Sequence, residues 1–304
     1  MKTSIETVYP GAGSVYNIAN IVARNATLSG LPDRIAVIDT NKEGNGKFSY
    51  SQLNSRVNKL AHALLISDIQ KEDRVFVLLP NKIETLETIL ACLKIGAIYT
   101  PANSRLSSEE IRFLIDDTEP KILIYDSDYS EKVSEVLRER SKPVSLIELG
   151  AHKLSAAKDY YDFVRDMPDG EPGIITESEE VCMILFTAGT TGRPKGVKFT
   201  HRGTFFASLV MGLSASLTRD DVYLTGSPMF HAGGLTCFLL YVPMVNGTIV
   251  LQSRWSPEEA LELIKEYRVT YYFGIATQLK MMTQVEGWED YMDSVRAVNG
   301  GGEP

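Results

Sequence analysis

Residues 187–196 bring together side chains that could bind a polyphosphate. They read Thr-Ala-Gly-Thr-Thr-Gly-Arg-Pro-Lys-Gly. The glycines allow backbone amides to turn toward an anion, the threonine hydroxyls donate hydrogen bonds, and Lys195 adds a positive charge. A surface loop in which these residues only make turns is the alternative interpretation. The nucleoside-triphosphatase loop does not fit, because positions 194–196 hold Pro-Lys-Gly where it needs Gly-Lys-Ser/Thr.

The elements that must position this segment can be predicted from the apolar pattern. Residues 181–186 form a continuous apolar run, as expected of a buried strand that leads into the loop. From residue 50 onward, short apolar runs alternate with segments of helical period, which is typical of βα units around a parallel sheet. We expect strands at 74–79, 97–100 and 121–125 in one series, and at 222–225, 248–251 and 269–273 in another.

Three helix starts carry a capping pattern. Asn81, Ser107 and Ser256 are each followed three residues later by a glutamate. In a capping box the first side chain accepts from a first-turn amide, and the glutamate reaches back to the amide of the capping residue. We therefore predict a helix after each of these three positions.

The two series predict an α/β fold with two layered subdomains, approximately 67–212 and 12–60 plus 222–304. Between the two series, residues 150–179 are polar and rich in proline and glycine, which indicates a surface connection. The last residues, 298–304, carry three glycines in succession, and a loop start is the natural interpretation. We therefore expect the sequence to be the amino-terminal part of a longer chain.

Composition restricts the class of protein. The 304 residues are 44% hydrophobic and 23% charged, as in a soluble globular protein, and the net charge of -8 argues against a nucleic-acid binder. Cys92, Cys182 and Cys237 are odd in number and lie in apolar stretches, so we expect buried free thiols in a reducing compartment. We find no signal peptide and no apolar run of about 20 residues, and we therefore expect a cytoplasmic location.

A longer pattern around the loop resembles a known family. Residues 185–197, followed by Thr200 and His201, resemble the Thr-Ser-Gly-Thr-Thr-Gly-x-Pro-Lys-Gly-Val signature of the acyl-CoA synthetase superfamily of adenylate-forming enzymes, and the fatty-acyl-CoA ligases in particular. Ala188 departs from it, because the family usually has serine there. Further elements of the family are matched in order by residues 48–53, 93–101 and 228–234, so that the resemblance covers residues 15–304.

The resemblance implies both a fold and an activity. The chain would be a truncated amino-terminal AMP-binding domain of two packed α/β subdomains, with the β-barrel part and the carboxy-terminal domain absent. In the family, a carboxylate attacks the α-phosphate of ATP with the assistance of Mg²⁺, and the thiol of coenzyme A then displaces AMP from the acyl-adenylate. The expected ligands are ATP, coenzyme A and a carboxylic acid, most simply a fatty acid. The resemblance leaves open whether the protein forms a homodimer, and it implies no metal site in the chain itself.

The resemblance also implies roles for individual residues. Lys195 and His231 would be catalytic, with His231 at the border of the acyl pocket, although a histidine satisfied within its own turn is the alternative. His201 would be structural, and we assign no role to His62 or His152. The residues that would hold the nucleotide are Thr187, Ala188, Gly189, Thr190, Thr191, Gly192, Lys195, Gly301, Gly302, Glu303 and Pro304.

Two other functions stay open at this point. An amino-acid or aryl-acid adenylating domain could serve a carrier protein, although the amino-acid type would usually carry an acidic residue within 230–235, and none is present. A non-catalytic nucleotide-binding fragment is the second alternative. It follows from the expectation that the carboxy-terminal lysine of the family, which closes the site over ATP, is missing here.

Overall fold

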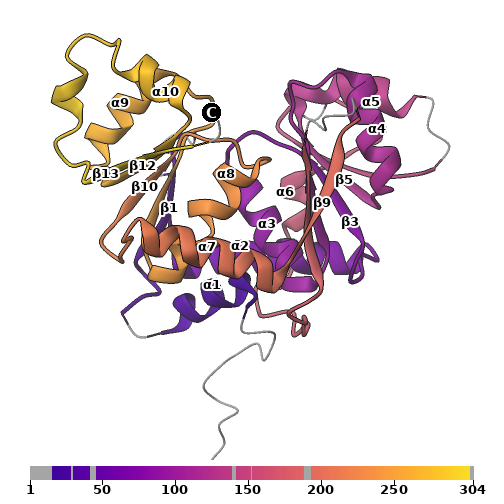
Figure 1. The fold of residues 1–304 in the computed structure, drawn as a ribbon. Helices are drawn as coiled ribbons and strands as arrows, with labels where there is room; N and C mark the ends of the chain where they lie inside the picture. Colours follow the sequence, from indigo (N-terminus) through magenta and orange to yellow (C-terminus); the bar gives the residue numbers. More distant parts are fainter. Residues whose placement is uncertain are drawn as a thin grey trace, which may run out of the picture. The chain divides into compact units, whose positions relative to one another are not determined.

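A computed structural model of the protein describes residues 16–28, 30–41, 46–138, 142–151, 153–187 and 193–301. The chain forms two compact units, each built on its own sheet (Figure 1). The α/β class with two layered sheets is therefore confirmed. The first unit comprises Met1–Asn20, Asn54–Pro80 and Thr85–Arg202, and the second comprises Ile21–Leu53, Asn81–Glu84 and Gly203–Pro304.

The first unit contains a seven-stranded sheet in the order β7-β6-β5-β3-β4-β8-β9. All neighbours pair in parallel except β8 and β9, which form an antiparallel hairpin at one edge. Its strands are β3 Arg74–Leu78, β4 Ile98–Pro101, β5 Ile122–Asp126, β6 Ser145–Leu149, β7 Lys158–Asp159, β8 Val181–Thr187 and β9 Lys195–Thr200. Its helices include α4 Ser108–Thr118, η2 Ser127–Tyr129, α5 Ser130–Leu137 and α6 Tyr160–Val164, together with most of α2 Tyr50–Ile66 and α3 Ile83–Ile95.

The core of the first unit lies between the sheet and the helix pair α4 and α5, which are side by side in Figure 1. Ile111, Leu114 and Ile115 of α4 are buried against Phe76 and Leu123 of the sheet. These α4 residues follow the helical period, so they lie on one face of the helix. Packing of this kind removes most of the apolar surface of each side chain from water, at roughly 25 cal/mol per Å².

The second unit contains a six-stranded sheet in the order β13-β12-β10-β11-β1-β2, parallel except for the β1–β2 pair. Its strands are β1 Ile35–Asp39, β2 Lys47–Ser49, β10 Val222–Thr225, β11 Thr248–Leu251, β12 Tyr271–Gly274 and β13 Ala297–Gly300. Leu261 and Ile264 of α9 pack with Leu224 and Tyr272 of the sheet. Its helices include α8 Ala232–Gly234, η3 Leu235–Leu239, η4 Val242–Val245, α9 Pro257–Glu266, α10 Ala276–Met282 and η5 Trp288–Tyr291, with most of α1 Ile18–Thr27 and α7 His201–Ser214.

The predicted helix caps have different outcomes. Ser107 forms the full capping box with Glu110 at the start of α4. Ser256 accepts from the Glu259 amide at the start of α9, but the Glu259 carboxylate accepts from Gln252 instead of completing the box. A helix does follow Asn81, because α3 begins at Ile83, but the Asn81 side chain is bonded to a distant backbone segment, and Asp39 Oδ2 accepts from the Ile83 amide.

The expected surface connection 150–179 is only partly irregular. It contributes the edge strand β7 and the short helix α6. Tyr160 at the start of α6 is buried, and its hydroxyl donates to Glu87 Oε2 at 2.9 Å. The polar composition of this stretch therefore concealed two elements that long-range contacts hold in place.

A buried lysine ties the end of this stretch to α2. The Lys94 side chain is 3% exposed, and its Nζ donates to Asn54 Oδ1 at 2.8 Å, Asn58 Oδ1 at 2.6 Å and Glu171 Oε2 at 2.9 Å. Burial lowers the pKa of Lys94, and the Glu171 carboxylate offsets only part of that effect. Such a network is stable only while every charge keeps its partners.

Substitution of Lys94 by methionine should lower the free energy of unfolding by about 3 kcal/mol, because the Glu171 carboxylate is left without its cation. The double variant Lys94→Met, Glu171→Gln should recover part of this loss, as measured by urea denaturation. Lys121→Met is the control, since Lys121 is 44% exposed and its ion pair with Asp73 is open to water. An equal loss in the control would contradict the prediction.

Two expectations from composition can be compared with the structure. Cys92 and Cys182 are buried free thiols, but Cys237 is partly exposed, so the expectation of burial was wrong for Cys237. Within the described ranges, no helix combines the length and the apolar character that a bilayer span requires.

Candidate functional site

The predicted phosphate loop connects the two strands of the hairpin at the edge of the first sheet. Thr187 is the last residue of β8, Lys195 is the first of β9, and the register places them opposite each other. Both residues are exposed. The structure thus brings Thr187 and Lys195 together at the base of the loop. Ala188, Gly189, Thr190, Thr191 and Gly192 lie outside the described residues.

The charge of Lys195 is available to a ligand. In the part of the chain that the structure describes, neither a carboxylate nor another acceptor binds its ammonium group. The following residue, Gly196, is tightly packed: a Cβ there would lie 3.0 Å from Ile184 Cγ2 and 3.4 Å from the Phe186 ring. The hairpin can therefore fix the backbone next to Lys195 and leave the side chain free.

Strand β9 itself was not predicted from the sequence. Its first four residues are all exposed, and Lys195 and Lys198 lie on an edge that no further strand covers. Exposed lysines are a common feature of edge strands, where they discourage pairing with other chains. A strand with so little burial lacks the apolar alternation by which sequence patterns are recognised.

His201 lies at the exit of the hairpin, as the first residue of α7. The residue is 1% exposed, and its Nε2 has no hydrogen-bond partner within the described residues. Burial lowers the pKa of His201 to about 4; the Glu180 carboxylate opposes this shift and Lys71 reinforces it. A buried neutral imidazole agrees with a structural role for this residue.

The pH dependence of stability should reveal the buried imidazole of His201. Between pH 6.5 and about 4, the unfolded chain takes up a proton that the folded chain does not, so His201 lowers stability as the pH falls through that window. The free energy of unfolding of His201→Gln relative to the parent protein should therefore rise by roughly 3 kcal/mol from pH 7 to pH 4. Urea denaturation at both pH values measures it, and a difference independent of pH would contradict the assignment.

In the second unit, His231 lies in the loop that follows β10. Its Nδ1 accepts a hydrogen bond from the Gly233 amide at 3.2 Å, and this bond caps the short helix α8. Because Nδ1 acts as an acceptor, the neutral ring carries its proton on Nε2. The residue is exposed, so Nε2 is accessible as a donor. Nδ1 of His231 is thus hydrogen-bonded within its own turn, and Nε2 is accessible to a ligand.

The His231 loop and Gly301 meet at an aromatic ring. A Cβ at Gly233 would lie 3.5 Å from Phe273, and a Cβ at Gly301 would lie 3.6 Å from the same ring. Both glycines follow the carboxyl ends of parallel strands, which is where open α/β sheets bind their ligands. Gly302, Glu303 and Pro304 lie outside the described residues.

Further rings continue the contact from Phe273 into the core. Phe238 lies 5.0 Å from Phe273 and 5.0 Å from Tyr271, measured between ring centroids. Tyr223 extends the group, with its ring 6.1 Å from Phe238. These three further rings are fully buried, so within this group Phe273, which is 7% exposed, is the ring next to Gly233 and Gly301.

Sequence reasoning missed two residues that hold this loop. Asn81 donates to the Ser227 carbonyl at 3.0 Å and accepts from the Met229 amide at 3.0 Å. Gln278 of α10 donates to the Gly226 carbonyl at 3.0 Å. Asn81 and Ser227 are 146 positions apart, so no local pattern could have shown their contact.

No three His, Cys, Asp or Glu side chains in the described part of the chain lie close enough together to hold a metal ion.

The family model described as AMP-binding enzyme matches residues 24–304. The chain belongs to the AMP-binding enzyme family. This AMP-binding domain is 30% identical over 286 residues to a feruloyl-CoA synthase of Amycolatopsis sp, covering 92% of this chain and 55% of the relative. It is 28% identical to the long-chain-fatty-acid–CoA ligase FadD13 of Mycobacterium tuberculosis, covering 88% of this chain and 52% of that protein. The chain thus spans about half the length of the curated relatives it matches.

Solved structures agree with the family assignment. The AMP-binding domain matches the inhibitor-bound N-terminal domain of FACL13 from Mycobacterium tuberculosis with a TM-score of 0.84 and 27% identity, covering 95% of this chain and 70% of the other. The anthranilate–CoA ligase AuaEII in complex with anthranoyl-AMP matches with a TM-score of 0.88 over 100% of this chain and 57% of the other. At 18% identity, the second match supports the fold alone.

Proposed function

We propose that the whole protein uses ATP to activate an apolar carboxylic acid and then transfers the acyl group to coenzyme A. The observation that carries the proposal is Lys195, which lies opposite Thr187 at the base of a glycine- and threonine-rich loop and has no partner among the described residues. Membership of the AMP-binding enzyme family supports it. The names of the relatives, a feruloyl-CoA synthase and a long-chain-fatty-acid–CoA ligase, suggest the class of acid.

The nucleotide would be held by residues 187–192, Lys195 and residues 301–304. Lys195 and the hydroxyls of the loop would bind the β- and γ-phosphates, where their charge is needed as pyrophosphate leaves. Positioning and charge stabilisation supply most of the catalysis in phosphoryl and nucleotidyl transfer. The backbone amide of Ala188 can still donate, but the family's serine hydroxyl is missing, and we infer a weaker hold on the phosphates.

The acid would lie beside His231 and Phe273. His231 Nε2–H would donate to the carboxylate and orient it toward the α-phosphorus, while Phe273 would contact its apolar body. The stretch 226–240 contains no acidic residue to meet an ammonium group, which argues against an amino acid as substrate. An apolar acid, aliphatic or aromatic, is therefore the substrate class that we propose.

The reaction would proceed in two steps. A carboxylate oxygen attacks the α-phosphorus of ATP, the bond from the α-phosphorus to the oxygen that bridges it to the β-phosphorus breaks, and pyrophosphate leaves with the electron pair of that bond. Mg²⁺, if bound with the nucleotide, would screen the charge of the phosphates. The deprotonated thiol of coenzyme A then attacks the acyl carbonyl, and AMP leaves with the electron pair of the acyl–oxygen bond. The residues named here act in the first step.

The proposal can be tested on the protein as expressed from its natural gene. Pyrophosphate release should depend on octanoate or ferulate and should not be stimulated by phenylalanine. Calorimetry with ATP and Mg²⁺ measures nucleotide binding independently of turnover. Binding without turnover on any acid would favour the non-catalytic alternative, and release dependent on phenylalanine would favour an amino-acid adenylating domain.

A further inference from the structure

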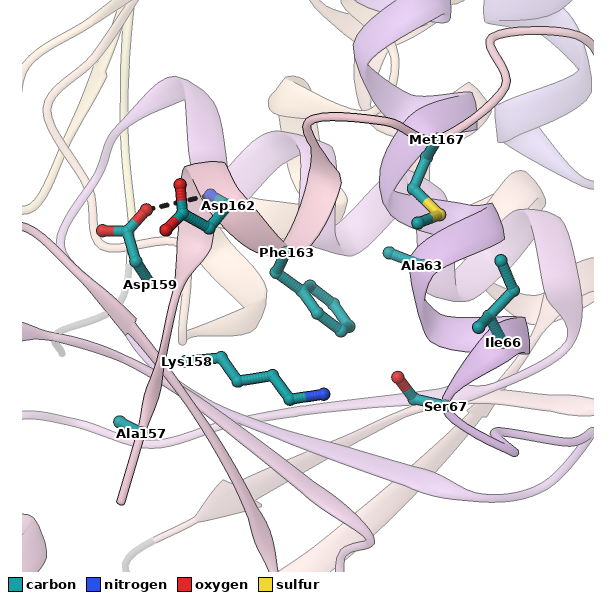
Figure 2. A pocket seen from close by; sticks show the side chains of 9 residues that line it. All are labelled: Ala63, Ile66, Ser67, Ala157, Lys158, Asp159, Asp162, Phe163 and Met167. Atoms are coloured by element: carbon teal, nitrogen blue, oxygen red, sulfur yellow. Dashed lines mark hydrogen bonds between the residues drawn. The ribbon is translucent and has the colours of Figure 1, made fainter. Parts of the chain in front are cut away.

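The first unit carries a groove away from the loop and from the strand ends described above. Figure 2 shows its walls: Ala63 and Ile66 of α2 with Met167 on one side, and Lys158 with Phe163 of the β7–α6 segment on the other. The cavity has a volume of about 470 Å³, within the usual range of small-molecule sites. An adjoining cavity of about 350 Å³ shares four of its lining residues: Ile66, Ser67, Lys158 and Phe163.

Most of the lining is apolar, and part of it is open to solvent. Phe163 is buried, whereas Ile66 at the end of α2 is 71% exposed. In the adjoining cavity the floor is formed by Ile122, Leu146 and Ile147 of the sheet. Apolar surface that stays in water in this way is stabilised when another apolar body covers it.

Lys158 places one positive charge at the end of this apolar surface. Its Nζ lies 6.0 Å from the centroid of the Phe163 ring, and no carboxylate within the described residues pairs with it. In Figure 2 the ammonium group is directed toward the Ser67 hydroxyl, which also has no hydrogen-bond partner in the described chain. Two donors therefore converge on one point beside an apolar wall.

The two carboxylates of the groove are occupied elsewhere. Asp159 accepts from the amides of Tyr161 at 2.8 Å and Asp162 at 2.9 Å, and Asp162 pairs with Arg165. Figure 2 shows both at the end of the groove that Lys158 points away from. The carboxyl end of α2 adds about half a negative charge, which the full charge of Lys158 exceeds.

We propose that this groove is a second binding site, for a monocarboxylate with an apolar body. The carboxylate binds Lys158 Nζ and the Ser67 hydroxyl, and the apolar body covers Ile66, Phe163 and Met167. The site is separate from the proposed reaction, because it uses none of the residues assigned to ATP or to the acid. Its ligand would be the proposed substrate itself or a free acid of the same chemistry.

Methyl NMR on protein labelled at isoleucine and methionine methyl groups tests the site. Octanoate should shift the Ile66 and Met167 signals in a saturable manner. The change Lys158→Met should weaken this binding about fivefold, as expected for one solvent-exposed ionic contact, and Lys158→Arg should restore it. Ile66→Ser should weaken it as well, since it removes an exposed apolar contact and costs little in folding.

Matched controls separate this site from other binding. Lys265→Met removes another lysine that lies over an aromatic ring, Tyr291, but does not line the groove, and it should leave the affinity unchanged. Octanol should bind without dependence on Lys158, and acetate should not bind. The proposal is overturned if the Ile66 and Met167 signals stay fixed while other methyl signals move, or if Lys265→Met weakens binding as much as Lys158→Met. Absence of pyrophosphate release would not affect this result.

Discussion

Replacement of Lys195 by alanine should lower acid-dependent pyrophosphate release about a hundredfold. The expectation follows from its position at the base of the loop: no described residue pairs with the side chain, and we propose that its charge serves the phosphates. Removal of one group that stabilises developing charge in an active site typically costs a hundredfold or more. The free energy of unfolding should change by less than about 0.5 kcal/mol, because the side chain is exposed.

Lys198 provides the control for this experiment. It lies on the same exposed strand, three residues farther on, and its side chain therefore faces the opposite side of the sheet. Lys198→Ala should leave the rate of pyrophosphate release within about twofold. If both variants lose activity equally, the effect belongs to the general charge of β9 and the assignment of Lys195 is wrong.

Replacement of Gly234 by alanine should lower the free energy of unfolding by about 3 kcal/mol and impair use of the acid. A Cβ at this position would lie 2.3 Å from the Pro228 carbonyl oxygen and 2.9 Å from that of Ser227. Both are backbone atoms, so the loop between them and His231 would have to move. Urea denaturation gives the stability change, and the KM for octanoate should rise because His231 is displaced.

The neighbouring glycine is a matched control. A Cβ at Gly233 would find its nearest neighbours, His231 Nδ1 and the Phe273 ring, at 3.5 Å, which is ordinary van der Waals contact. Gly233→Ala should therefore change the free energy of unfolding by less than about 1 kcal/mol. Equal destabilisation by both substitutions would show that the close approach to Pro228 is not the cause.

Local patterns predicted the elements whose determinants are close in sequence. The Ser107 capping box closes within one helical turn, and the apolar face of α4 needs only the helical period. A helix follows Asn81 as predicted, but Asp39 Oδ2 accepts from the Ile83 amide at 3.1 Å, while the Asn81 side chain holds a loop near Met229. A side chain with two polar groups goes where tertiary contacts satisfy both, and sequence spacing does not report those contacts.

The candidate site shows the same difference between local and long-range determinants. The order of residue types in 187–196 by itself indicated the family, which the family model confirms. It also predicted phosphate binding, which stays a prediction, because glycine conformation and threonine and lysine donors are properties of the residues. Only the tertiary structure decided that Thr187 and Lys195 face each other across a hairpin, and that Gly233 and Gly301 meet at Phe273. The groove beside Lys158 is likewise visible only in the tertiary structure, because it joins α2 to a segment about 90 positions away. Strand register and the meeting of strand ends depend on contacts between distant residues, which the order of residue types alone does not specify.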